Sequence, residues 1–199
     1  MAELTKTSPE KLFTVRDMAF TGMFAVIIAI CSWISIPTTV PFTLQTFAVF
    51  CALGLLGGKR GFFAVLVYII LGAIGIPVFA GFSGGLGVLA GSTGGYIIGF
   101  LLSAAAYWMI TKVFGTKLPV VIISMVIGLA LCYTFGTVWF IQVYTSKVES
   151  IGLMAALGWC VFPFILPDCV KIALAILIAK RLPKRFVYQG VATKKDAAV

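Results

Sequence analysis

The sequence predicts an all-α integral membrane protein with six transmembrane helices and both termini in the cytoplasm. Hydrophobic residues make up 61% of the chain and charged residues only 11%, whereas soluble domains carry about 25% charged residues. Several long apolar runs indicate that the chain crosses the membrane repeatedly. We expect a cytoplasmic segment at residues 1–17, one membrane domain at 18–182 and a cytoplasmic tail at 183–199.

The first apolar run, Met18–Ile36, is expected to remain in place as a membrane-spanning helix, because it is longer than the apolar part of a usual signal peptide. Thr14 and Asp17 have the spacing of a capping box at its start. Ala25 and Ala29 form a stripe of small residues, which lets helix backbones approach closely in lipid. The stripe fits either docking against another subunit or an ordinary contact within the chain.

An uncharged turn at 37–43 separates this helix from a short helix at 44–56, which begins with polar residues, and a third helix is expected at 62–76. The following segment, 77–96, is rich in glycine and carries no charge. Non-helical backbone at membrane depth is tolerated only where it is buried in protein or lines a cavity. Glycine also lets a ligand approach the backbone closely. We therefore expect this glycine-rich segment to lie near a ligand.

Three further helices are expected at 94–110, 117–144 and 152–180. The last of them contains Pro163 and Pro167. Proline inside a helix either kinks or breaks it, and the sequence leaves both outcomes open.

The basic residues predict the orientation of the chain. Cytoplasmic loops carry an excess of Lys and Arg. All Lys and Arg except Lys147 and Lys171 lie in four segments that six crossings place on one side, namely 1–17, 57–61, 111–118 and 180–199. Both termini are therefore expected inside, with the 37–43 turn and the glycine-rich segment outside. The same distribution disfavours nucleic acid as a partner, despite the net charge of +9.

Two opposite charges, Asp168 and Lys171, lie within the last apolar run. They are three residues apart, so they share one face of a helix. Along a helix they lie roughly 18 and 14 Å from Lys180, near the middle of the bilayer. A charge at this depth costs roughly 2.5–3.5 kcal/mol and indicates a functional site. The simpler alternative is a packing pair whose charges neutralise each other. We expect a pocket open to the outside with one acid and one base.

The residue inventory narrows the chemistry. The chain has no histidine, and its five cysteines lie in apolar runs without a CxxC pair, so we expect no cofactor, no metal site and no catalytic residue. A membrane enzyme is disfavoured because no second acid or histidine accompanies Asp168. The sequence contains no ATP-binding motif. Energy for transport is therefore expected from partner subunits or from an ion gradient.

Four motifs resemble those of the BioY family, the biotin-binding S components of energy-coupling factor (ECF) vitamin transporters. The resemblance covers about Phe20 to Leu182, and the family pattern leads us to expect proline where this chain has Ser92. It implies an ECF S-component-like membrane protein, located in the bacterial cell membrane, that captures biotin from outside. The motifs are Val40-Pro41-Phe42-Thr43-Leu44-Gln45-Thr46, Gly75-Ile76-Pro77-Val78-Phe79-Ala80-Gly81, Gly91-Ser92-Thr93-Gly94-Gly95-Tyr96 and Pro163-Phe164 followed by Asp168 and Lys171.

The resemblance also implies partners and a binding site. The partners are a transmembrane coupling subunit, contacted through Ala25 and Ala29, and two ATP-binding subunits. Asp168 is expected to accept hydrogen bonds from the ureido N–H groups of biotin and Lys171 to donate to a ligand oxygen. The other residues expected at the ligand are the polar positions Thr43, Gln45, Gly81, Ser83, Gly94 and Tyr96 and the apolar walls Trp33, Phe79, Phe82 and Trp159.

A different transport class remains open on the sequence alone. The alternative is a stand-alone secondary transporter or facilitator for biotin or another small vitamin. A purely structural membrane scaffold would leave the intramembrane charge pair and the uncharged glycine-rich segment unexplained.

Overall fold

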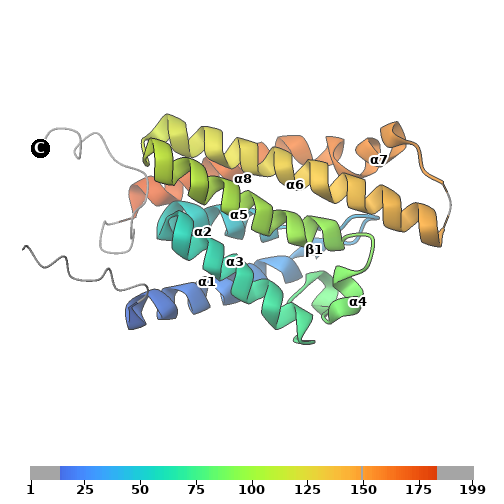
Figure 1. Ribbon diagram of the computed structural model, residues 1–199, viewed down its shortest axis with the longest axis horizontal. Helices are drawn as coiled ribbons and strands as arrows, with labels where there is room; N and C mark the ends of the chain where they lie inside the picture. The colour runs from blue at the N-terminus through green and yellow to red at the C-terminus, as the bar shows by residue number, and fades with distance from the viewer. Residues whose placement is uncertain (1–13, 149, 183–199) are drawn as a thin grey trace, which may run out of the picture.

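The computed structural model describes residues 14–148 and 150–182, and these form a helical bundle with one small hairpin (Figure 1). The expected segment at 1–17 and the tail at 183–199 lie almost wholly outside the described residues. The elements, in chain order, are α1 (Val15–Trp33), β1 (Ser35–Ile36), β2 (Phe42–Thr43), α2 (Gln45–Leu56), α3 (Gly58–Ala73), the 3-10 helix η1 (Ala80–Phe82), α4 (Leu86–Leu89), α5 (Gly94–Phe114), α6 (Leu118–Lys147), α7 (Leu153–Cys160) and α8 (Phe162–Arg181).

The predicted capping box starts α1. The Thr14 hydroxyl accepts a hydrogen bond from the Asp17 backbone N–H at 3.2 Å, and the Asp17 carboxylate accepts one from the Thr14 N–H at 3.0 Å. The helix ends at Trp33, three residues before the expected end at Ile36. A residue that precedes proline is disfavoured in helical geometry, and Ile36 precedes Pro37.

The described chain is helical as predicted, and a short antiparallel hairpin encloses the turn expected at 37–43. Strand β1 pairs with β2, with Ser35 opposite Thr43 and Ile36 opposite Phe42. The glycine-rich segment likewise contains two short helical pieces, η1 and α4. Both features lie toward the end of the bundle that also holds α7, on the right of Figure 1.

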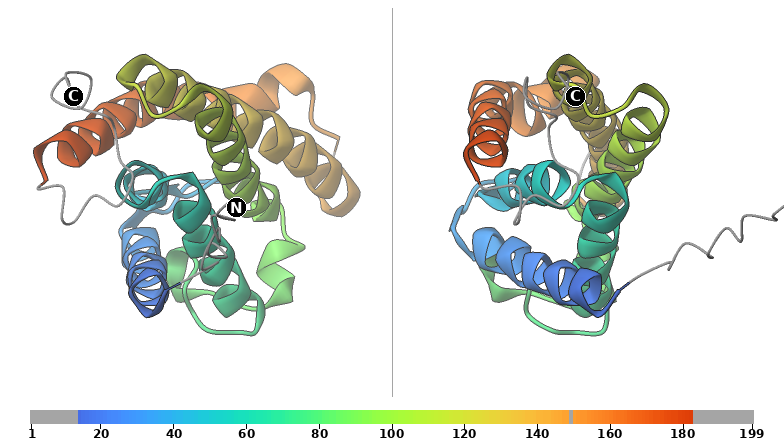
Figure 2. Two further views of the ribbon diagram at one scale, coloured as in Figure 1. Left: turned by 60° about the vertical axis from the view of Figure 1, so that its left-hand side comes forward. Right: turned by 90° about the vertical axis from the view of Figure 1, so that its left-hand side faces the viewer.

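Four helical stretches of the described chain are long and apolar enough to cross a membrane: Val15–Trp33, Gly94–Phe114, Leu118–Lys147 and Leu153–Arg181. The first residue of α1 and the last of α8 lie at the same end of the bundle, on the left of Figure 1. Helix α2 is apolar but has only 12 residues. It packs against α1, α3 and α8 in the middle of the bundle (Figure 2). All its residues except Phe47 are buried, as is typical of a helix that is apolar on every side.

Helices α5 and α6 form the most extensive helix–helix contact. A Cβ atom at Gly95 would overlap the Trp139 side chain, and one at Gly99 would overlap Cys132. From the opposite helix, a Cβ at Gly128 would overlap Ser103. Small residues thus let these two backbones approach closely, as the four-residue spacing of glycine predicts for membrane helices.

The last apolar run is broken, and the break lies at Val161. This residue leaves helical geometry with φ −125° and ψ −58°, and α8 starts at the next residue. Pro163 lies in the first turn of α8, where its missing N–H removes no helical hydrogen bond. Pro167 lies inside α8, which continues through it to Arg181. The break at Val161 therefore places Asp168 and Lys171 in the first half of α8.

Candidate binding site

A cavity of about 770 Å3, part of it open to solvent, lies between the hairpin, the glycine-rich segment and the last helices. It is predominantly lined by apolar side chains, with a small number of polar groups, which is the usual composition of a small-molecule site. The lining residues are Val40, Pro41, Thr43, Gln45, Thr46, Phe79, Ala80, Ser83, Val88, Thr93, Tyr96, Ile97, Phe100, Leu129, Cys132, Tyr133, Cys160, Phe164, Asp168 and Lys171.

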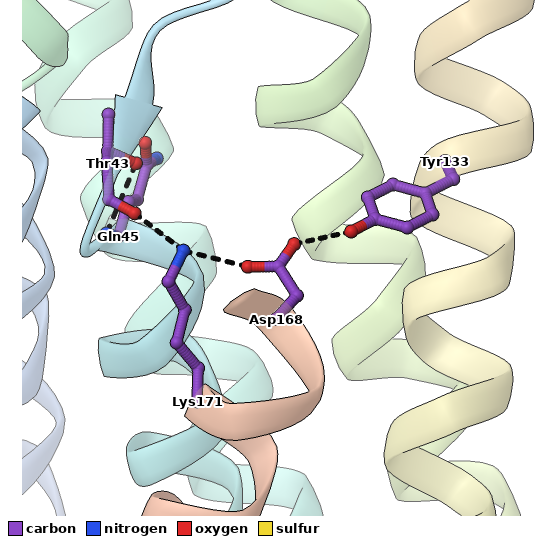
Figure 3. Close-up of polar contacts among 5 residues, drawn as sticks. All are labelled: Thr43, Gln45, Tyr133, Asp168 and Lys171. Atoms are coloured by element: carbon purple, nitrogen blue, oxygen red, sulfur yellow. Dashed lines mark hydrogen bonds and ion pairs between the residues drawn. The ribbon is translucent and has the colours of Figure 1, made fainter. Parts of the chain in front are cut away.

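The predicted charge pair is formed and lines this cavity (Figure 3). The Lys171 Nζ atom lies 2.8 Å from Asp168 Oδ1, and the two residues are only 6% and 2% exposed. The second carboxylate oxygen, Oδ2, accepts a hydrogen bond from the Tyr133 hydroxyl at 2.6 Å. One partner on α8 and one on α6 therefore fix the orientation of the Asp168 carboxylate.

Lys171 also ties α8 to the hairpin. Its ammonium donates to the backbone carbonyl of Thr43 at 2.8 Å and lies 4.4 Å from the centre of the Phe42 ring. The Phe42 ring in turn packs against Phe164 on α8, with 5.6 Å between ring centroids. Two of the three ammonium protons are thus hydrogen-bonded within the chain, and the ammonium also makes a cation–π contact with Phe42.

Several neutral polar groups of the wall are hydrogen-bonded within the protein. Gln45 donates through Nε2 to the Tyr68 hydroxyl at 2.9 Å, and its backbone N–H donates to the Thr43 hydroxyl at 3.2 Å. The Tyr96 hydroxyl is 2.9 Å from that of Thr137. These hydrogen bonds fix the side chains of the wall before any ligand enters, which lowers the entropy cost of binding.

The sequence model of the BioY family matches residues 5–188. The chain belongs to the BioY family. It is 40% identical over 171 residues to the biotin transporter BioY of Thermotoga maritima, which covers 85% of this chain and 97% of that protein. It is 38% identical over 169 residues to the probable biotin transporter BioY of Pyrococcus horikoshii, covering 84% and 96%.

A solved structure of similar fold supports the same assignment. The crystal structure of the S-component for biotin from an ECF-type ABC transporter superposes with a TM-score of 0.74 at 28% sequence identity. The match covers 85% of this chain and 92% of that one. With its apolar helices, this BioY chain is a multi-pass membrane protein.

Seven of the residues predicted at the ligand line the cavity of this BioY protein. They come from β2, α2, both sides of η1, α5 and α8, which the bundle brings together. These residues are Thr43, Gln45, Phe79, Ser83, Tyr96, Asp168 and Lys171.

Both predicted tryptophans lie outside the cavity lining, which corrects the expectation that they form its walls. Trp33 stacks on Phe82 with 5.0 Å between ring centroids, and its Nε1–H donates to the Pro77 carbonyl at 2.9 Å. Trp159 is 46% exposed and contacts the edge of Tyr144. Trp33 with Phe82 therefore supports the glycine-rich segment from outside, and Trp159 lies on the surface.

The two predicted glycines also lie outside the lining, and each has a backbone role instead. Gly81 adopts φ +68° within η1, a region that favours glycine. A Cβ atom at Gly94 would overlap the Leu89 carbonyl. These glycines shape the turn and the start of α5, while Ser83 and Thr93 reach the cavity.

The stripe of Ala25 and Ala29 faces the interior of the protein. Ala25 is 1% and Ala29 4% exposed, and α1 packs against α2 and α3. The structure thus shows the contact within the chain that was the alternative to docking. The two side chains are covered by neighbouring helices and present no surface to another subunit.

Several lining residues were not among those predicted at the ligand, and Tyr133 is the most consequential of them because it holds Asp168. Helix α6 is apolar along its 30 residues, so no polar stripe marks the face that turns toward the cavity. Thr46, Thr93 and Phe164 lie within the motifs that resemble the family but were not singled out as ligand residues, and Cys132 and Cys160 were noted only as cysteines in apolar runs. No cluster of three or more His, Cys, Asp or Glu that could hold a metal ion occurs among residues 14–148 and 150–182.

Proposed function

We propose that this BioY protein is the biotin-binding membrane subunit of an ECF-type vitamin uptake transporter. It captures biotin from the outside and delivers it through an ATP-driven coupling module. The observation that carries the proposal is the buried Asp168–Lys171 pair at the wall of an otherwise largely apolar cavity. Support comes from related proteins described as biotin transporters and as an S-component for biotin.

The ion pair complements the ureido ring of biotin. In a cyclic urea, an N–H donor and the C=O acceptor point to the same side of the ring. A carboxylate beside an ammonium presents an acceptor and a donor side by side, at 2.8 Å in this cavity. Asp168 accepts from the ureido N–H, and the third proton of Lys171 donates to the ureido oxygen. Such charge-assisted hydrogen bonds are about twice as strong as neutral ones.

The remaining wall suits the rest of the bicyclic ring and the aliphatic chain of biotin. Phe79, Tyr96, Phe100 and Phe164 provide apolar and aromatic surface. Thr43, Gln45 and Ser83 add neutral polar atoms close to the charge pair or the glycine-rich segment. A mostly apolar pocket with a few convergent polar groups is expected to bind a ligand of this kind.

Six crossings and cytoplasmic termini are part of the proposal. Helices α2 and α3 add two short crossings to the four long ones. Because α2 is covered by protein, it does not have to match the full thickness of the hydrocarbon core. The positive-inside rule then places the end of the bundle that carries Lys59, Lys112 and Lys180 in the cytoplasm. The hairpin and the glycine-rich segment, which contribute to the cavity lining, lie toward the opposite end of the bundle, so in this proposal the cavity opens to the outside.

Partner subunits supply the energy. The chain contains no ATP-binding motif, and in this proposal a transmembrane coupling subunit and two ATP-binding subunits drive uptake. The alternative is a stand-alone secondary transporter or facilitator. Uptake of labelled biotin by cells with and without the partner subunits distinguishes the two, because only the coupled system loses rapid, ATP-dependent uptake when the partners are removed.

Equilibrium binding to the purified full-length protein tests the substrate. We expect tight binding of biotin and no measurable binding of thiamin or riboflavin at the same concentrations. Binding of thiamin or riboflavin without binding of biotin would overturn the assignment of biotin.

A further inference from the structure

The charged groups at the cavity wall are few. Among the lining residues, all of which belong to the described chain, only Asp168 and Lys171 carry a formal charge at neutral pH. Their side chains are joined at 2.8 Å, so the wall has no net charge. Biotin itself is an anion at neutral pH, because its side chain ends in a carboxylate.

Lys171 is poorly placed to receive that carboxylate in addition. Its ammonium already donates to Asp168 Oδ1 and to the Thr43 carbonyl, and the Phe42 ring covers another side. A ligand carboxylate at Nζ would lie close to the carboxylate of Asp168, and two like charges at such a distance repel each other. The favourable partner for the remaining proton of Lys171 is therefore a neutral oxygen such as that of the ureido group.

The rest of the wall offers only neutral donors. The hydroxyls of Thr46 and Thr93 line the cavity and have no hydrogen-bond partner within the described part of the chain. Thr93 occupies the N-cap position of α5, and its side chain makes no capping hydrogen bond. A helix N-terminus carries a fractional positive charge, which strengthens binding of an anionic group over a neutral one by only about fivefold.

We infer that the cavity recognises the ureido ring and does not require the negative charge of the ligand's side chain. This inference rests on the proposed function, because it concerns the orientation of biotin in the same cavity. The ring lies against Asp168 and Lys171, while the side chain lies against neutral groups or in the part of the cavity open to solvent. The ligand class is then biotin together with its neutral side-chain derivatives, such as amides and esters.

Competitive binding of biotin and biotinamide to the purified full-length protein tests the inference. Biotinamide replaces the carboxylate by an uncharged amide of nearly the same size. We expect the two dissociation constants to differ by less than about tenfold, with biotin methyl ester in the same range. A loss of about tenfold or more for biotinamide would overturn the inference, because a loss of that size is expected when a hydrogen bond to a charged partner is removed.

Substitution of Lys171 shows whether its ammonium contacts the ureido group or the carboxylate of biotin. In Lys171→Met we expect the affinities for biotin and biotinamide to fall by the same factor, within about threefold. A loss for biotin that exceeds the loss for biotinamide by tenfold would place the carboxylate at Lys171 and overturn the inference. If Lys171→Met does not fold, the neutral double variant Asp168→Asn/Lys171→Met is compared with Asp168→Asn in the same way.

The outcomes separate this inference from the proposed function. Failure of the parent protein to bind biotin would contradict the proposed function itself. Tight binding of biotin together with rejection of biotinamide and of the methyl ester would leave the proposed function intact and contradict only the inference.

Discussion

Two acid–base pairs lie within this apolar bundle, and they differ in what surrounds them. Asp168 and Lys171 pair at 2.8 Å within α8. Asp17 on α1 and Arg60 on α3 also pair at 2.8 Å. Both carboxylates are almost completely buried. The distance and the burial therefore do not distinguish a binding site from a structural link.

Both carboxylates have one hydrogen-bond partner on each oxygen, so access to the cavity makes the distinction. Asp17 caps the start of α1 by accepting from the Thr14 N–H, and it lies outside the cavity lining. Asp168 also has a partner on each oxygen, yet it lines the cavity. A carboxylate can accept about four hydrogen bonds, so Asp168 retains acceptor sites that a ligand in the cavity can use.

The largest effect is expected for Asp168→Asn. We expect its dissociation constant for biotin to rise about tenfold to a hundredfold, because a hydrogen bond to a charged group contributes about 1.5–3 kcal/mol. Isothermal titration of the purified variant measures the effect. Binding as tight as that of the parent protein would contradict the role of Asp168.

A stability control separates loss of the site from loss of the fold. Removing one partner of a buried pair is strongly destabilising, so the melting temperature of Asp168→Asn is measured in the same detergent. The double variant Asp168→Asn/Lys171→Met removes both charges. We expect it to regain thermal stability without regaining tight binding.

The opposite result is expected for Asp17→Asn. The amide keeps the capping contact with Thr14 but removes the charge opposite Arg60. We expect a loss of about 2 kcal/mol in the free energy of unfolding, below the range for fully buried pairs because the Arg60 side chain is 20% exposed. The dissociation constant for biotin should stay within about twofold. A tenfold loss of affinity at unchanged stability would show that the two pairs do not differ as described.

A smaller effect on binding is expected for Tyr133→Phe. The variant removes only the hydrogen bond to Asp168 Oδ2, so the carboxylate is still present but less well oriented. We expect the affinity for biotin to fall about fivefold to tenfold. Biotin methylated at the ureido nitrogens serves as a probe, because it cannot donate to Asp168. For this ligand the effect of Tyr133→Phe should be less than twofold, and an equal effect on both ligands would indicate a general structural role.

Much of the fold follows from local sequence properties. Long apolar runs predict α1, α5, α6 and the pair of α7 and α8, because hydropathy and length report directly on membrane-spanning helices. The ends of the helices were predicted less well, since helix ends depend on capping and on neighbouring residues. The hairpin was missed because its strands have two residues each, too few to show a periodic pattern.

The binding site was predicted best at its charged residues, because burying a charge inside a membrane costs free energy. Asp168 and Lys171 are conspicuous because ionised side chains are rare inside membrane helices. Their neighbour Tyr133 was missed because tyrosine on an apolar helix fits a lipid interface as well as a pocket. Which face of α6 turns inward is set by its contact with α5, where glycines admit the opposing side chains. This is information about the tertiary structure that the pattern of α6 alone does not contain.

The smallest effect on biotin affinity is expected for Trp159→Leu. This variant tests whether a residue next to the lining in sequence, but outside it in space, contributes to binding. Trp159 lies directly before Cys160, a lining residue, but its own side chain is half exposed and contacts Tyr144. We expect the dissociation constant for biotin to change by less than twofold. The matched variant Phe164→Leu removes an aromatic ring that lines the cavity, and it should weaken binding by about fivefold through lost aromatic and apolar contact. Equal losses of affinity in the two variants would contradict the placement of Trp159 outside the cavity.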